Sequence, residues 1–182
     1  MKNYARVVVI GGGVVGVSTL YHLVKKGWTD CVLIERKELT SGSTWHAAGL
    51  LPLFNMSYSV GQIHKYSVDL YGRLEEETGQ YAGLSRVSNI RLATTQDRMD
   101  EYKQYAGVAQ TIGVQVDILT PDEVVDIWPL AVKDNLIGAI RHPMDGYIQP
   151  ADLTQALAKG ARDIGGQVYR NTNVTAITRT LS

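Results

Sequence analysis

The sequence predicts an α/β protein, and three features that follow one another near the amino terminus support this prediction. The β-branched run Arg6–Ile10 is typical of a buried strand. It leads into Gly11-Gly12-Gly13-Val14-Val15-Gly16, which contains the glycine pattern G-x-G-x-x-G. A second apolar run, Cys31–Ile34, ends in Glu35, about 20 residues after the last glycine. Strand, glycine-rich turn, helix, strand and acid in this order indicate a Rossmann-like dinucleotide-binding fold.

Each glycine of the pattern has a mechanical role in such a fold. Gly11 permits the tight turn, Gly13 lets the backbone approach a pyrophosphate, and Gly16 lets the helix pack closely on the strand. The helix ends near Gly27, which is a suitable residue for a left-handed helix terminus. No acidic residue occurs between Val14 and Lys26, so the amino terminus of this helix favours an anion such as a diphosphate.

The end of the second strand supplies the acidic residue of the pattern. A carboxylate at Glu35 can accept hydrogen bonds from ribose hydroxyls, although a solvated carboxylate at a strand end is the structural alternative. The role of the neighbouring Arg36 is less specific, since an exposed arginine after a strand is common.

Alternating helices and strands are expected along the rest of the chain. Thr95 is a candidate cap for one helix, and Thr120-Pro121-Asp122-Glu123 is a capping box with proline at the first helical position. In chain order we expect a helix over 57–79, a strand over 90–94, a helix from Thr95, a short helix ending by Pro129, a strand over 136–141, a helix from Pro150, and strands over 167–169 and 174–178.

The small-residue loop Thr40–Thr44 bears on which dinucleotide binds. Its hydroxyls and backbone N–H groups can continue along a cofactor from the diphosphate, for which a nicotinamide site has no standard need. The loop therefore favours FAD over NAD. An NAD-dependent dehydrogenase domain remains the alternative.

At this point the sequence resembles a known family. Gly11–Ser18, Glu35-Arg36 and Gly42–Leu50 resemble the amino-terminal part of the dimethylglycine and sarcosine dehydrogenases, FAD-dependent oxidoreductases of the D-amino-acid-oxidase-like superfamily. The likeness continues through 74–80, 90–95, 145–150 and 153–157 and so covers nearly the whole chain.

The resemblance implies a covalent flavin. In that family the histidine of the Trp-His-Ala-Ala-Gly-Leu segment is joined to the flavin 8α carbon, and this chain has His46 there. The cofactor-binding residues that the pattern and the resemblance together imply are Gly11, Gly13, Val14, Val15, Gly16, Glu35, Arg36, Gly42, Ser43, Thr44, Trp45, His46, Ala47, Ala48, Gly49, Leu50 and Val174.

The chemistry expected of His46 has independent support. A neutral imidazole is a good nucleophile near physiological pH, and an oxidised flavin can expose its 8-methyl carbon as an electrophile. The structural alternative is an uncharged histidine that is hydrogen-bonded within a loop.

The resemblance also implies an activity. The expected reaction is oxidation of the N-methyl C–N bond of a small amino acid such as dimethylglycine or sarcosine, with a hydride equivalent passing to the flavin. Water or tetrahydrofolate would resolve the resulting iminium, and oxygen or an electron-transfer flavoprotein would accept the electrons. The catalytic residues are not identified, and we expect the substrate-binding residues beyond Ser182.

The resemblance divides the chain into three segments. Residues 1–81 and 146–182 are expected to belong to the FAD-binding domain, and residues 82–145 to begin an α+β substrate domain. At 182 residues the chain is expected to be an amino-terminal fragment that is inactive alone, with tetrahydrofolate relevant only to the full-length protein. A non-catalytic flavin-binding fragment or partner subunit is a second alternative.

Composition agrees with a water-soluble enzyme domain. With 18 basic and 18 acidic residues, nothing favours nucleic acid or an anionic membrane as a partner. No apolar run approaches the roughly 20 residues of a membrane span, and no signal peptide begins the chain, so we expect a cytoplasmic protein or a mature form in the mitochondrial matrix. Cys31 is the only cysteine, and no cluster has metal-ligand spacing, so neither an internal disulfide nor a metal is expected.

Overall fold

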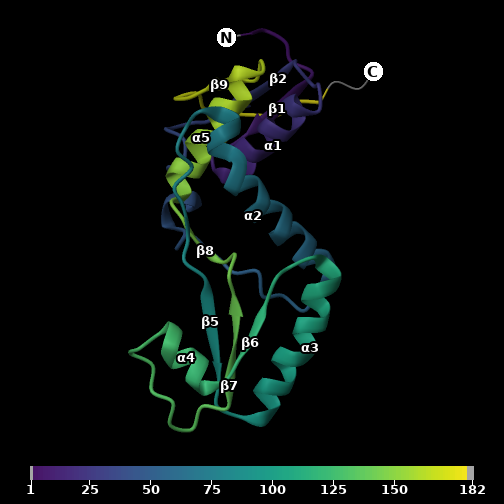
Figure 1. Cartoon of the computed structure of the whole chain (residues 1–182). Helices are drawn as coiled ribbons and strands as arrows, with labels where there is room; N and C mark the ends of the chain where they lie inside the picture. The colour runs from purple at the N-terminus through teal and green to yellow at the C-terminus, as the bar shows by residue number, and fades with distance from the viewer. Residues whose placement is uncertain (1, 180–182) are drawn as a thin grey trace. The chain divides into compact units, whose positions relative to one another are not determined.

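In the computed structural model, which describes residues 2–179, the strands pair into three small sheets with the orders β1-β2-β9, β3-β8-β4 and β5-β7-β6 (Figure 1). The chain divides into two compact units. The first contains the chain up to Gly49, Tyr71–Leu84 and the chain from Ile148 onward, and the second contains Leu50–Leu70 and Ser85–Tyr147. The mixture of helices and strands confirms the predicted α/β class.

The first unit is built on a parallel sheet. Strand β1 (Val7–Ile10) pairs in parallel with β2 (Cys31–Ile34), which pairs in parallel with β9 (Gln167–Tyr169). Helix α1 (Val14–Lys25) connects β1 to β2, as the βαβ prediction requires. The helix ends where expected, because Gly27 adopts φ +88° just beyond its last residues.

Helix α5 (Pro150–Asp163) packs closely against α1 in the same unit. A Cβ atom at Gly160 would lie 2.9 Å from the Tyr21 ring, so the two helices can approach this closely only with glycine there. The buried face of α5 consists mainly of small residues, namely Ala156, Ala158, Gly160 and Ala161. Leu153 and Leu157 are buried on the same helix.

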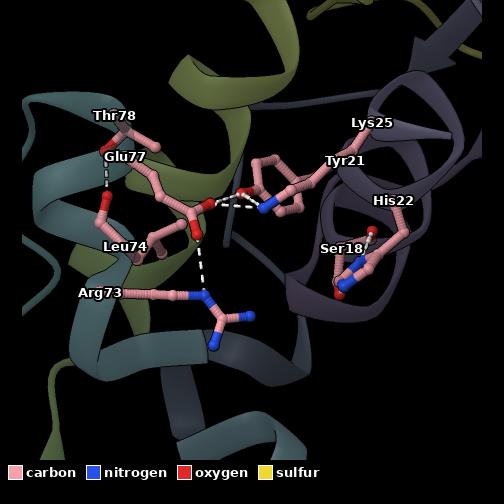
Figure 2. A network of polar contacts seen from close by, with 8 residues as sticks. All are labelled: Ser18, Tyr21, His22, Lys25, Arg73, Leu74, Glu77 and Thr78. Atoms are coloured by element: carbon pink, nitrogen blue, oxygen red, sulfur yellow. Dashed lines mark hydrogen bonds and ion pairs between the residues drawn. The ribbon is translucent and has the colours of Figure 1, made fainter. Parts of the chain in front are cut away.

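The end of helix α2 (Tyr58–Thr78) is joined to α1 by a polar network (Figure 2). The Glu77 carboxylate accepts hydrogen bonds from Lys25 Nζ at 2.6 Å, from Arg73 Nε at 2.8 Å and from the Tyr21 hydroxyl. These donors lower the pKa of Glu77 from 4.5 to about 2, with the Lys25 bond as the largest cause. The network connects the helix that follows the glycine-rich turn to the last turn of α2.

The second unit has an antiparallel sheet with a core on each face. Strand β7 (Gly138–His142) pairs with β5 (Asn89–Ala93) and β6 (Asp117–Leu119). Successive strand residues face opposite sides, so Ile140 packs with α3 (Gln96–Ile112) while Ala139 packs with α4 (Pro121–Ile127). Figure 1 shows these two helices beside this sheet.

The helix caps predicted from the sequence are confirmed. Thr95 accepts a hydrogen bond from the Arg98 N–H at the start of α3. Thr120 and Glu123 form a full capping box, with Pro121 at the start of α4. The short elements that complete the chain are the 3₁₀ turn η1 (Ser43–His46), β3 (Leu50–Leu51), β4 (Leu84–Arg86) and β8 (Gly146–Ile148).

The strand predicted over 174–178 is wrong. After β9 the chain bonds to the segment just past the end of β2, through Asn171 N–H to Lys37 O at 3.2 Å and Thr172 N–H to Glu35 O at 2.9 Å. These bonds lie beyond the ends of the paired strands, and residues 172–179 form neither a strand nor a helix. The residues 174–178 therefore do not form the expected strand.

The compact units and the predicted segments divide the chain differently. Leu50–Leu70 packs in the second unit, whereas the prediction assigned it to the first segment. What each segment binds stays a prediction. Among the helices of residues 2–179, none combines the length and the apolar character that a membrane span needs.

Candidate functional site

Pairing of β1 with β2 places the glycine-rich turn beside the acidic residue. The register aligns Val7 with Cys31 and Ile10 with Ile34, so Gly11 and Glu35 leave the sheet at the same edge. The Gly11 N–H donates to Ile34 O at 2.9 Å, which closes the ends of the two strands together. In open α/β sheets, ligands bind at this carboxyl edge.

A cleft of about 600 Å³ opens at this edge of the sheet. Its volume is that of a typical small-molecule site. It is lined by the glycine-rich turn, the end of β2 and the loop before η1, and the predicted cofactor residues among its lining are Gly11, Gly13, Val14, Val15, Gly16, Glu35, Arg36, Gly42, Ser43 and Thr44. A neighbouring hollow of about 170 Å³ shares Gly11, Glu35 and Arg36 with the cleft and adds Val174. The structure thus brings together residues that lie 163 positions apart in the sequence.

The glycines let the turn pack closely against the protein around it. A Cβ atom at Gly16 would lie 2.0 Å from the Gly11 carbonyl oxygen, and one at Gly12 would lie 2.6 Å from Leu39 Cδ2. Gly11 itself adopts φ +113°, which favours glycine. Helix α1 has no acidic residue in its first turn, so its N–H groups and partial positive charge suit an anion. The residues present therefore fit the diphosphate of a dinucleotide.

Glu35 has a local role that the sequence did not indicate. Its Oε2 atom accepts the Gly12 N–H at 2.6 Å, and its Oε1 atom accepts the Lys37 N–H at 2.8 Å. The carboxylate thereby holds the glycine-rich turn to the end of β2. Each carboxylate oxygen has a further lone pair and can therefore still accept a hydrogen bond from ribose. That bond stays a prediction.

The turn that contains His46 begins at the cleft and then leaves it. Thr44 is buried, and its hydroxyl oxygen accepts the Val14 N–H at 2.9 Å. Trp45 is 70% exposed and His46 is also exposed. The predicted residues Trp45, His46, Ala47, Ala48, Gly49 and Leu50 are not among those that line the two hollows, and Leu50 starts β3 in the second unit.

A buried polar group in the second unit was not identified from the sequence. His142 is fully buried, and burial lowers its pKa to about 4. Asp145 is buried as well, and burial raises its pKa to about 6 even though Oδ1 accepts the Leu53 N–H at 2.9 Å. The Tyr105 hydroxyl donates to the Leu53 carbonyl at 2.9 Å, so both polar groups of Leu53 are held by buried side chains.

The remaining chemical candidates are structural. Cys31 is buried in β2, and this burial raises the pKa of its thiol, which disfavours the thiolate needed for nucleophilic attack. Among residues 2–179 no group of three or more His, Cys, Asp or Glu side chains is arranged to hold a metal ion.

Comparison with known proteins identifies the family. The model of the FAD dependent oxidoreductases matches residues 6–182. The chain belongs to this family. It is 46% identical to the mitochondrial dimethylglycine dehydrogenase of Rattus norvegicus over 164 residues, which are 90% of this chain and 19% of that protein. It is also 39% identical to the mitochondrial pyruvate dehydrogenase phosphatase regulatory subunit of Mus musculus, over 93% of this chain and 19% of that protein.

Solved structures agree with the family assignment. The L-proline dehydrogenase from P. horikoshii superposes with a TM-score of 0.88 at 27% identity, over 98% of this chain and 47% of that one. The resemblance to the dimethylglycine dehydrogenases and the D-amino-acid-oxidase-like fold are therefore confirmed. The chain spans about a fifth of the length of these two curated relatives.

Proposed function

We propose that this chain supplies the FAD-binding part of an oxidoreductase that oxidises the N-methyl C–N bond of a small amino acid such as dimethylglycine or sarcosine. The cleft at the carboxyl ends of β1 and β2, in a chain of the FAD dependent oxidoreductase family, is the observation that carries the proposal. The likeness to dimethylglycine dehydrogenase supports this choice of substrate class.

Each part of the cleft has an assigned task. Gly11–Gly16 and the amino terminus of α1 hold the diphosphate, and Glu35 adds a hydrogen bond to ribose. Arg36 and Val174 border the adenine end, because they line the smaller hollow beside Gly11. When bound, FAD supplies a two-electron oxidant. The first unit is then the FAD-binding domain, and the second begins the substrate domain.

The loop Gly42–Leu50 continues from the diphosphate toward the flavin, and His46 forms the covalent bond. The imidazole of His46 is exposed and lies two residues after Thr44, which is fixed to α1. Exposure leaves the ring accessible to the flavin 8α carbon. The NAD-dependent alternative loses support because the family model covers nearly the whole chain.

His46→Ala, made in the whole protein, tests the covalent assignment. Wild-type protein precipitated with acid should retain yellow flavin, whereas the variant should release its flavin into the supernatant. His64→Ala, which removes an imidazole from α2, is the control and should retain the flavin. Undiminished acid-stable flavin in His46→Ala would falsify the assignment.

The substrate proposal is tested by formaldehyde release from dimethylglycine and from sarcosine. The electron acceptor is identified by comparing turnover with oxygen and with an electron-transfer flavoprotein, each with and without tetrahydrofolate. Cell fractionation shows whether the protein lies in the cytoplasm or in the mitochondrial matrix. Residues 1–182 alone should show little turnover, because the residues expected to position the substrate lie beyond Ser182. An error of about 1 Å in positioning can cost about a hundredfold in rate. Turnover by the chain equal to that of the whole protein would contradict this placement of the substrate residues.

A second candidate function is a flavin-binding subunit without catalysis. The 39% identity to a protein named as a phosphatase regulatory subunit supports it. A whole protein that binds FAD but releases no formaldehyde from either amine would favour this candidate.

A further inference from the structure

Thr44 fastens the turn that carries His46 to the glycine-rich segment. In η1 it is the buried residue, 7% exposed, while its neighbours Ser43 and Trp45 face solvent. Its hydroxyl oxygen accepts the N–H of Val14, the first residue of α1, at 2.9 Å. A Cβ atom at Gly13 would lie 3.0 Å from the same oxygen, so the fit is close.

The backbone around Thr44 forms a closed turn. The Ala47 N–H donates to Thr44 O at 3.2 Å, and the Trp45 N–H donates to Thr40 O at 3.2 Å. Thr40 in turn donates its N–H to Gly12 O at 3.0 Å and adopts φ +73°. His46 lies inside this turn, so its backbone position follows from the bonds that Thr40 and Thr44 make to the glycine-rich segment.

We propose that Thr44 is a positioning residue for His46, whose hydroxyl, bonded to the Val14 N–H, sets the distance from the diphosphate-binding segment to the imidazole. This inference rests on the proposed function. When FAD is held at its diphosphate, the flavin ring can lie only within a limited distance of the glycine-rich segment. The turn must therefore be fixed if the His46 nitrogen is to stay near the 8α carbon. The expected consequence is control of the rate of covalent attachment, separate from the affinity for FAD.

The covalent step balances as follows for one FAD. A bond forms between a His46 ring nitrogen and the flavin 8α carbon, one C–H bond of the 8-methyl group breaks, and the imidazole N–H proton is lost. Two protons and two electrons therefore leave the pair. Dioxygen takes up both and becomes hydrogen peroxide, which leaves the attached flavin oxidised.

The experiment measures attachment and affinity separately in the whole protein, prepared without flavin. Acid-stable flavin fluorescence is followed in time at a series of FAD concentrations under air. The limiting rate reports the covalent step, and the half-saturating concentration reports binding. The variants are Thr44→Val, which removes the acceptor, Thr44→Ser, which keeps it, and Thr111→Val as a matched control on α3.

Thr44→Val should lower the limiting rate about ten- to a hundredfold, since about 1 Å of misplacement can cost a hundredfold. The half-saturating FAD concentration should change less than threefold. Thr44→Ser should restore the wild-type rate, and Thr111→Val should not alter it. In Thr44→Val the Val14 amide should also exchange its hydrogen faster, because its hydrogen-bond acceptor is lost.

Two results would overturn the inference while the proposed function stands. One is a Thr44→Val limiting rate equal to that of the wild type, and the other is a loss explained entirely by weaker FAD binding. If Thr44→Val does not fold, Thr44→Ala takes its place and should show the same loss of limiting rate at unchanged affinity. A wild-type limiting rate in Thr44→Ala, or one in Thr44→Ser as low as that of Thr44→Ala, overturns the inference. Wild-type protein that acquires no acid-stable flavin would overturn the covalent part of the proposed function and this inference with it.

Discussion

Replacing Gly16 with alanine tests how closely α1 must approach the glycine-rich turn. The added Cβ would lie 2.0 Å from the Gly11 carbonyl oxygen and 3.5 Å from Val9 Cγ1. The first contact must lengthen by about 1 Å or more, since overpacking of this kind is relieved only by backbone movement. The movement shifts the first turn of α1, whose residues Val14, Val15 and Gly16 line the cleft. The contact is with backbone, so no side-chain rotation can relieve it.

The expected cost has two parts. Overpacking lowers the free energy of unfolding by about 1–3 kcal/mol. A misplaced charge-assisted hydrogen bond to phosphate costs about 1.5–3 kcal/mol, which weakens binding roughly ten- to a hundredfold. Urea unfolding followed by circular dichroism measures the first part, and calorimetric titration of residues 1–182 with ADP measures the second.

Gly107→Ala is the matched control for this substitution. Gly107 lies within α3, and a Cβ atom there meets nothing within 4 Å. The substitution should stabilise the protein by up to about 1 kcal/mol through helix propensity and leave ADP binding unchanged. An unaltered ADP dissociation constant in Gly16→Ala would refute the reasoning, because the clash could then be absorbed without moving the site.

Two further predictions follow from the perturbed carboxyl groups. Glu77, with its pKa lowered to about 2, stabilises the fold above its unfolded pKa of 4.5, and this stabilisation is lost as the pH falls through 2. Glu77→Gln should therefore lower the free energy of unfolding by about 1–3 kcal/mol at pH 7 and by much less at pH 2.5, and equal urea midpoints at pH 7 would count against the network. Asp145 has the opposite shift, to about 6, so its ionisation destabilises the fold as the pH rises from 3.8 through 6. Asp145→Asn keeps an oxygen acceptor for the Leu53 N–H and should stabilise the protein at pH 8 by about 1–3 kcal/mol, with no gain near pH 4; a loss of stability at pH 8 would contradict the argument.

The parts of the fold that the sequence predicted depend on neighbouring residues. The turn at Gly11–Gly16, the end of α1 at Gly27 and the capping box at Thr120 each involve groups within a few positions of one another. Backbone conformation and helix capping are determined at this range, so a single sequence contains the necessary signal. The position of Glu35 beside the glycine-rich turn follows in the same way, because one helix and one strand separate it from the glycines; its hydrogen bond to ribose stays a prediction.

The parts that the sequence did not predict depend on contacts between distant residues. The bond from Val14 to Thr44 joins positions 30 apart, and the Glu77 network joins α1 to a residue 52 positions beyond Lys25. The burial of His142 could not be predicted from the sequence either, since a histidine before a proline indicates only a loop. The wrong prediction of a strand over 174–178 shows the same limit, because a segment becomes part of a sheet only where another strand is available for pairing.

Val174 shows how the site is completed by a segment that follows the whole second unit. The pairing of β9 with β2 fixes where the chain re-enters the first unit, and the Thr172 N–H bond to Glu35 O then carries it past the end of β2. Val174 lines the hollow beside Glu35 as a result. Every residue that lines this hollow and the larger cleft belongs to the first unit, so the proposed ADP site depends on that sheet. Asp145→Asn, a change in the second unit, should consequently alter stability with pH while the ADP dissociation constant stays within twofold of the wild type.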